Sequence, residues 1–270
     1  MPFANVNSTR LFYRLEGRAG LPVLVLAHSL GCDHEMWAPQ LPDFMQHFQV
    51  LRYDTRGHGA SAVPAGDYTL EQLGRDALEL TNELGIPKFA WCGLSMGGAI
   101  GQWMALNIPE RLTALVLANT SAKFGTADTW EARRRAAREG GMQAIVDGVM
   151  QRWFSAEILA RNDPYAQSIR SVFLGTDPAG YVACCAALRD VDYTKLLTKI
   201  RVPTLVIGGA GDPSTPWAEH GAILARDIPG AKAVQLPAAH LSNLGIPRAF
   251  TASVLEFLLR SDSYADGSEV

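Results

Sequence analysis

The ten residues WCGLSMGGAI (91–100) decide the fold of this chain. The apolar run KFAWCGL (88–94) leads into Ser95, and the helical pattern SMGGAIGQWMALNIP starts at the same residue. Gly93 and Gly97 flank the serine, two residues before it and two residues after it. Glycines at both places let neighbouring backbone pass close to a very sharp turn, which raises the serine hydroxyl above the carboxyl end of a strand. The stretch therefore predicts a strand, a tight turn and a helix, with Ser95 at the corner.

Further apolar runs rich in valine and leucine lie on both sides of this turn. They show little alternation, as is typical of strands buried on both faces of a parallel sheet. Helical patterns separate them, and the pattern over 69–85 ends at Gly85 and Pro87. We therefore expect an α/β fold with a mostly parallel sheet flanked by helices, and an early antiparallel edge formed by PFANV and TRLFYRLE. The expected strands cover residues 22–28, 48–54, 88–94, 112–119, 203–210 and 231–237.

The alternation of strands and helices is interrupted once. From about Ser121 to Thr198 the sequence contains only helical patterns, and so long a helical segment between two strands predicts an inserted lid. We therefore expect two parts in the chain. Residues 1–120 and 199–270 form an α/β core, and residues 121–198 form a helical cap.

Composition and charge narrow the class of protein. The chain has 270 residues, of which 48% are hydrophobic and 19% charged, as is typical of a globular protein with one large α/β domain. The net charge of −3 gives no basic footprint for nucleic acid, and no cluster of lysines and arginines has the character of a lipid-binding patch. We therefore expect a small-molecule substrate, no nucleic-acid partner and no membrane partner.

The cysteines and the first residues of the chain bear on its location. Cys184 and Cys185 are adjacent, and neither they nor Cys32 and Cys92 have the spacing of zinc ligands, which favours four reduced thiols. The N-terminal stretch MPFANVNSTRLF lacks the charged start and apolar core of a signal peptide. We therefore expect a cytoplasmic protein.

A serine hydroxyl at such a corner becomes a nucleophile when a base removes its proton and an acid orients that base. In chain order the acid is expected after a late strand and the histidine after the last strand. Asp212 follows the run PTLVIGGA, and His240 follows the run AKAVQLP. The sequence therefore predicts a catalytic triad of Ser95, Asp212 and His240.

The same chemistry needs donors for a developing oxyanion. In a turn of this kind one donor is the backbone N–H of the residue after the nucleophile, here Met96. The loop HSLGCD (28–33) follows an early strand, and we expect its Leu30 N–H to be the second donor. We expect neither a metal nor an organic cofactor, because no cluster of carboxylates and histidines has metal-ligand spacing and no glycine-rich nucleotide loop occurs.

Taken together, these motifs resemble those of the α/β-hydrolase superfamily, over nearly the whole chain. Within it the sequence is similar to the 3-oxoadipate enol-lactonases of aromatic-compound catabolism. One departure is Cys32, beside the oxyanion loop, where the family pattern has a threonine. The stretches that carry the resemblance are AHSLGCDHEMW (27–37), LRYDTRGHGAS (51–61), CGLSMGGAIGQW (92–103), LANTSAKFG (117–125) and HLSN (240–243).

The resemblance implies an α/β-hydrolase fold and hydrolytic opening of a lactone ring through an acyl-enzyme. The lactone of this family carries a free carboxylate, so the cap is expected to bind an anion. In DTWEARRRAAREGG (128–141) Trp130 and Arg133 lie three residues apart and share a helix face. We therefore expect Arg133 to bind the substrate carboxylate and Trp130 to form a wall of the pocket, whereas the alternative is a solvated helix face.

Three other functions remain open from the sequence. The same triad serves general carboxylesterases and perhydrolases, although perhydrolases tend to carry a proline beside the oxyanion loop, where this chain has Leu30-Gly31-Cys32. It also serves hydrolases that cleave a carbon–carbon bond. A small-molecule receptor that keeps the fold without hydrolysis is disfavoured by the intact triad.

Overall fold

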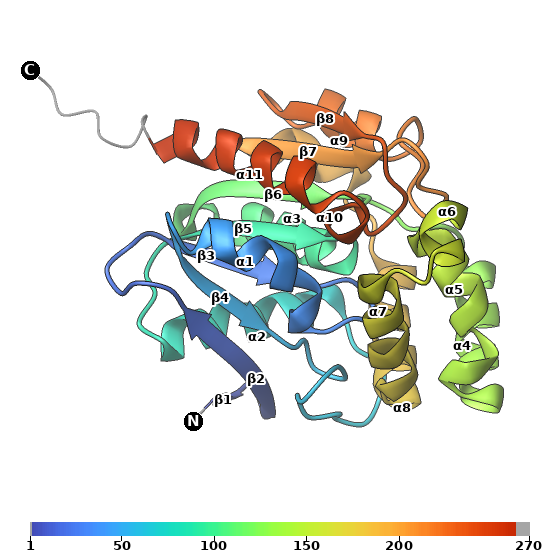
Figure 1. Ribbon diagram of the computed structural model, residues 1–270. Coiled ribbons are helices and arrows are strands. Elements are labelled where there is room, and N and C mark those ends of the chain that lie inside the picture. The colour runs from blue at the N-terminus through green and yellow to red at the C-terminus, as the bar shows by residue number, and fades with distance from the viewer. Residues whose placement is uncertain (1, 263–270) are drawn as a thin grey trace, which may run out of the picture.

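The computed structural model describes residues 2–262, and its centre is an eight-stranded sheet (Figure 1). The strand order is β1-β2-β4-β3-β5-β6-β7-β8. Strands β3 to β8 pair in parallel, whereas β2 pairs antiparallel with both β1 and β4. The strands are β1 (Phe3–Val6), β2 (Thr9–Glu16), β3 (Val23–Ala27), β4 (Gln49–Tyr53), β5 (Phe89–Leu94), β6 (Leu112–Ala118), β7 (Thr204–Gly209) and β8 (Lys232–Leu236).

The six strands expected from the apolar runs are confirmed, each to within one residue at either end. The early antiparallel edge is confirmed as β1 and β2. Every residue of β5 and of β7 is buried, as the lack of alternation in their sequences predicts. The two faces of the sheet are therefore both covered, and its functional surface is the edge where the parallel strands end.

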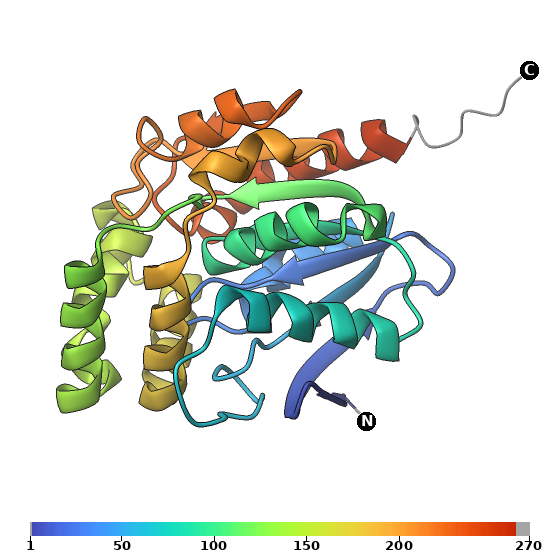
Figure 2. The same cartoon turned by 180° about the vertical axis from the view of Figure 1, so that it is seen from behind.

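Helices cover both faces of the sheet. One face carries α1 and α11, and the opposite face carries α2, α3 and α9 (Figures 1 and 2). The α-helices are α1 (Leu41–Phe44), α2 (Leu70–Glu83), α3 (Met96–Asn107), α4 (Ala127–Gly140), α5 (Val146–Trp153), α6 (Ala156–Ala160), α7 (Pro164–Gly175), α8 (Pro178–Asp190), α9 (Gly221–Asp227), α10 (Ser242–Gly245) and α11 (Pro247–Asp262). Short 3-10 helices are η1 (His34–Gln40), η2 (Pro109–Arg111), η3 (Met142–Ala144) and η4 (Thr194–Lys199).

Helix α2 shows how local sequence sets these boundaries. Its N-cap, Thr69, accepts a hydrogen bond from the N–H of Gln72, and the Gln72 side chain accepts one from the N–H of Thr69. This reciprocal capping box satisfies two donors that the first helical turn leaves free. The helix is followed by Gly85, whose φ of 64° is a left-handed conformation that ends helices.

Helices α4 to α8, which we call the cap, follow β6 and precede β7, and they lie beyond the carboxyl ends of the parallel strands (Figures 1 and 2). Within the cap, α4 packs against α8. The cap also contacts the core closely, because a Cβ at Gly180 of α8 would lie 2.3 Å from the carbonyl oxygen of Gly57. A division into a core and a cap domain with the boundaries 121–198 stays a prediction. Residues 263–270, which the prediction assigns to the core, lie outside the described part of the chain.

Candidate active site

Ser95 occupies the turn between β5 and α3 in a conformation that few non-glycine residues adopt. Its φ is 57° and its ψ is −112°, and strain of this kind costs roughly 1–3 kcal/mol. A Cβ at Gly93 would lie 2.1 Å from the carbonyl oxygen of Gly97, and a Cβ at Gly97 would lie 2.1 Å from that of Ala27. Both glycines are therefore required by close backbone approach, as the sequence predicts.

The backbone around this turn leaves one N–H donor free. The N–H of Ser95 donates to the carbonyl of Ala118 at 2.9 Å, and the N–H of Gly97 donates to the carbonyl of His28 at 3.1 Å. Between them the N–H of Met96 has no acceptor among the described residues. It stands at the first turn of α3, where the helix favours negative charge.

The loop after β3 leaves a second donor free in the same way. The N–H of Gly31 donates to Nε2 of His58 at 2.9 Å, and the N–H of Cys32 donates to the carbonyl of Ser29 at 3.1 Å. The N–H of Leu30 has no acceptor within residues 2–262. The two N–H groups expected to bind an oxyanion are thus those that the local backbone does not use.

Asp212 and His240 meet although they follow different strands. Asp212 comes after β7 and His240 after β8, and Nδ1 of His240 lies 2.8 Å from Oδ2 of Asp212. Burial alone would raise the pKa of the Asp212 carboxyl, but the charge of His240 and hydrogen bonds from His240, Asn119 and Thr215 hold that pKa well below its usual range. The carboxylate is therefore ionised and fixes the imidazole with Nδ1–H toward it.

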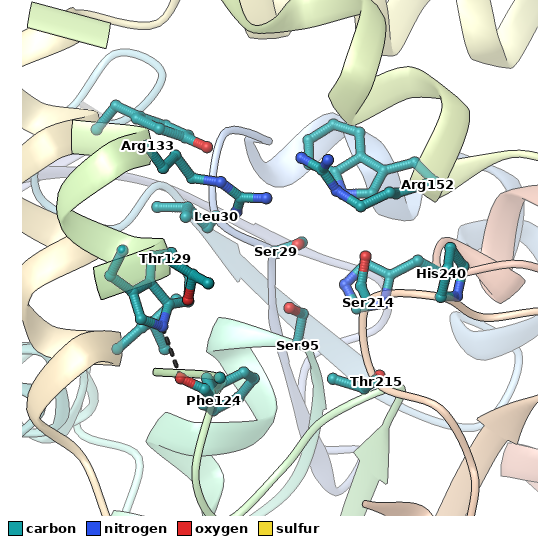
Figure 3. Close-up of a pocket in the computed structure, with 16 residues that line it drawn as sticks. Ser29, Leu30, Ser95, Phe124, Thr129, Arg133, Arg152, Ser214, Thr215 and His240 are labelled. Carbon is teal, nitrogen blue, oxygen red and sulfur yellow. Dashed lines mark hydrogen bonds between the residues drawn. The ribbon is translucent and has the colours of Figure 1, made fainter. Parts of the chain in front are cut away.

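Ser95 and His240 line one cavity of about 330 Å³ beneath the cap (Figure 3). Leu30 lines it too, together with Ser29 and Ser214. No hydrogen bond joins Ser95 to His240 among the described contacts. Such a bond is often long without substrate and tightens when substrate is bound.

The cap residues expected to bind substrate also line this cavity. Nε1 of Trp130 donates to the carbonyl of Phe124 at 2.6 Å, which fixes the indole, and the guanidinium carbon of Arg133 lies 5.1 Å from the centre of a Trp130 ring (Figure 3). Arg134, the next residue, is buried instead and forms an ion pair with Asp67. The helical spacing therefore places Arg133 at the cavity and its neighbour away from it.

Two groups of residues at this site were missed from the sequence. Arg152 and Tyr181 reach the cavity from α5 and α8, and no motif surrounds them. Asn119 donates from Nδ2 to Oδ2 of Asp212 at 3.0 Å and accepts at Oδ1 from the Ser242 hydroxyl at 2.6 Å. The signals for Asn119 were its position at the end of an apolar run and within LANTSAKFG (117–125), one of the stretches that carry the family resemblance.

The described residues also bear on metal binding, membrane spanning and disulfide formation. Within residues 2–262 no group of three or more histidine, cysteine or acidic side chains is arranged to hold a metal ion. No single helix in that range is long and apolar enough to cross a membrane, and α7 and α8 reach such a length only together, bent by 99°. All four cysteines are free and buried.

Comparison with known proteins agrees with the fold and with a hydrolase. A family model described as alpha/beta hydrolase fold matches residues 22–245. The 3-oxoadipate enol-lactonase 2 of Acinetobacter baylyi is 39% identical over 244 residues, which cover 90% of this chain and 91% of that protein.

Two solved structures are similar over nearly their whole length. The enol-lactonase from Burkholderia xenovorans LB400 is 43% identical with a TM-score of 0.94, covering 96% of this chain and 100% of that one. A thermophilic esterase from Thermogutta terrifontis with malate bound is 31% identical with a TM-score of 0.88, covering 96% and 98%. The chain thus belongs to the alpha/beta hydrolase fold family, in which it resembles the 3-oxoadipate enol-lactonases, and it is a carboxylic ester hydrolase.

Proposed function

We propose that this chain opens the ring of 3-oxoadipate enol-lactone to give 3-oxoadipate, in the catabolism of aromatic compounds. One observation carries the proposal most directly. The strained Ser95, the hydrogen-bonded pair of Asp212 and His240, and two arginines without carboxylate partners among the described residues all line or adjoin the same cavity. This arrangement suits an ester-like substrate with a negative charge, and the similarity to enol-lactonases supports the same substrate class.

The first step forms an acyl-enzyme. His240 takes the hydroxyl proton of Ser95 at Nε2, and Oγ of Ser95 attacks the lactone carbonyl. The N–H groups of Leu30 and Met96 donate hydrogen bonds to the oxyanion. They stabilise it because the backbone already holds them in position, so that no reorganisation is needed. As the C–O bond of the ring breaks, the enol oxygen takes the proton from His240 and stays tethered to the acyl group.

The second step releases the acyl group. His240 removes a proton from a water molecule, which attacks the acyl carbon, and the second oxyanion uses the same two N–H groups. Oγ of Ser95 leaves with the proton from His240. Asp212 stabilises the imidazolium form in both steps, and the freed enol becomes the ketone of the product.

Substrate recognition belongs to the cap in this proposal. Arg133 binds the carboxylate of the lactone, and the Trp130 ring beside it excludes water and strengthens the ion pair. The thermophilic esterase with malate bound supports this, since a relative of the same fold binds a carboxylate-bearing molecule.

The location that we propose for the protein is the cytoplasm. Four free, buried thiols support it.

A substrate panel tests the proposal. Its members are the enol-lactone with its free carboxylate, the methyl ester of that lactone, and a simple aryl ester of similar size. We expect kcat/KM to be largest for the carboxylate-bearing lactone, by about tenfold or more over the others, with 3-oxoadipate as the product identified by chromatography. A larger kcat/KM for the aryl ester would instead assign the chain as a general carboxylesterase.

A further inference from the structure

The cavity beneath the cap holds two guanidinium groups and is without a carboxylate in its described lining. Arg133 comes from α4 and Arg152 from α5, and both side chains point toward the space above Ser95 (Figure 3). The other polar side chains of the lining are hydroxyls, the indoles of Trp130 and Trp153, and the imidazole of His240. The described lining is therefore positively charged and supplies no counter-ion of its own.

The fully buried arginines among the described residues, Arg52, Arg56 and Arg134, are each paired with a carboxylate. Among them, Arg52 forms an ion pair with Glu16 at 2.6 Å and Arg56 forms one with Asp76 at 2.5 Å. Such pairing offsets the cost of removing a charge from water.

Arg152 has no ion pair within residues 2–262, although it is only partly exposed. Arg111 is also partly exposed and has no ion pair in that range, but it donates hydrogen bonds to the carbonyls of Pro87 and Ile86. Arg152 makes no such side-chain hydrogen bond among the described residues, and an anion supplied from outside would give it a partner.

The guanidinium groups of Arg133 and Arg152 are close enough to influence each other and the same neighbouring side chain. Burial lowers the pKa of Arg152 first, and the positive charge of Arg133 lowers it further. The hydroxyl of Tyr181 lies within the influence of both guanidinium groups. Two like charges that face each other without a partner repel, and a carboxylate between them removes that repulsion. A carboxylate also has two oxygens, so each guanidinium can donate to a different one.

We propose that Arg152 is a specificity-determining residue that, together with Arg133, binds one carboxylate of the substrate between the two guanidinium groups. The proposal rests on the proposed function and deepens it. Residues from two helices of the cap, α4 and α5, bind the same carboxylate of the substrate. The position of this site relative to Ser95 then fixes the separation between the carboxylate and the ester carbonyl that the enzyme accepts.

Substitution of each arginine tests the proposal through substrate selectivity. The variants are Arg152→Gln, Arg133→Gln and both together, and the readout is kcat/KM for the carboxylate-bearing lactone divided by kcat/KM for its methyl ester. Each single change is expected to lower this ratio by about tenfold to a hundredfold. Arg135→Gln is the matched control, because Arg135 lies exposed on the same helix as Arg133 and does not line the cavity.

The double variant separates one shared carboxylate from two separate ones. If both arginines bind the same group, the double variant loses much less than the product of the two single losses, because groups that share a partner are not additive. Multiplicative losses would overturn the shared site. A ratio for Arg152→Gln no lower than that for Arg135→Gln would overturn the role of Arg152 altogether.

A binding experiment keeps this test independent of the chemistry assigned to Ser95. In an enzyme carrying Ser95→Ala, calorimetry with hexanoate and with methyl hexanoate measures preference for a carboxylate without turnover. We expect this preference to fall at least tenfold when Arg152→Gln is added, and to recover in part with Arg152→Lys. An unchanged preference would contradict the arginine site, even if Ser95 proves to be the nucleophile.

Discussion

At the scale of single residues, Asp212 uses both of its carboxylate oxygens fully. Oδ1 accepts hydrogen bonds from the N–H groups of Ser214 and Thr215 at 2.8 and 3.1 Å. Oδ2 accepts from His240, from Asn119 and from the Thr215 hydroxyl at 2.7 Å. Five donors and no competing acceptor mean that only an ionised carboxylate fits this position.

Replacing this carboxylate by an amide therefore has two expected effects. In Asp212→Asn the new NH₂ group must face donors whichever way the amide is turned, so unfolding should become easier by about 1–3 kcal/mol. The imidazolium of His240 also loses its counter-ion, so kcat should fall by at least about a hundredfold. Urea unfolding and steady-state kinetics measure the two effects. Normal turnover would require another carboxylate to orient His240.

The difference between predicted and missed residues follows from where each lies in the fold. Ser95, Asp212 and His240 each follow a strand, and parallel strands bring their carboxyl ends to one edge, so their chain order already predicts that they meet. Arg152 reaches the cavity only through the orientation of α5 relative to the sheet. The pattern of apolar and polar residues along a helix does not determine that orientation, because it depends on how the cap helices pack against one another.

At the scale of elements, the contrast between Arg133 and Arg134 shows the same limit. Helical spacing places both residues near the face of Trp130. A rotation of 100° per residue then directs Arg133 to the cavity and Arg134 to Asp67 and Glu131. The sequence predicts the helix and Arg133 as its cavity residue, but the ion pairs of Arg134 depend on the packing of the cap and are not predicted.

The position of α8 depends on two glycines in contact. A Cβ at Gly180 would lie 2.3 Å from the carbonyl oxygen of Gly57, and a Cβ at Gly57 would lie 2.8 Å from Cα of Gly180. Both obstacles are backbone atoms, which cannot rotate away as a side chain does. This contact fixes the helix that carries Tyr181 into the cavity.

Gly180→Ala is expected to lower the free energy of unfolding by roughly 1–3 kcal/mol, as overpacking does, although alanine is the better helix former. The displaced α8 would also move Tyr181, so KM for the carboxylate-bearing lactone should rise. Thermal unfolding and kinetics check both effects. Gly175→Ala is the control, because a Cβ at Gly175 of α7 meets no atom within 4 Å. Equal stability of the two variants would contradict close docking of α8.

At the scale of the whole molecule, two buried histidines link the stability of the fold to pH. Nε2 of His58 accepts from the N–H of Gly31 at 2.9 Å, and Nε2 of His28 accepts from the N–H of Thr55 at 2.9 Å. Both imidazoles must therefore be neutral in the folded chain. Burial is the main cause that lowers the pKa of His58, to about 3.

The unfolded chain binds a proton at His58 below a pH of about 6.5, whereas the folded chain does not until much lower pH. Stability is therefore full above that value and is lost as the pH falls, by about 2 kcal/mol between pH 7 and pH 5 for this one residue. Urea unfolding at both values measures the loss. In His58→Gln the amide oxygen accepts from Gly31 without titrating, so the loss should shrink by about that amount. An unchanged loss would contradict a neutral, buried His58.

We propose that the edge of the sheet provides the groups for catalysis and the cap provides the groups for substrate binding. The sheet edge carries Ser95, His240 and the N–H group of Leu30, to which we assign catalysis, while the cap carries the arginines and the aromatic walls. The sequence predicts that the first group lies together, because the glycine-flanked turn at Ser95 and the positions of residues after parallel strands can be read from short stretches of sequence. It predicts the cap as helical but leaves its packing open.

The central claim is that Ser95 is the nucleophile that opens a carboxylate-bearing enol-lactone. The most direct measurement is kcat/KM of purified Ser95→Ala with this lactone beside the unchanged enzyme, with thermal unfolding of both to show that the fold is retained. We predict a loss on the order of 10³-fold or more at an unchanged unfolding temperature, because the oxyanion donors and the cavity remain while the attacking oxygen is gone. Turnover near that of the unchanged enzyme in the folded variant would contradict the claim.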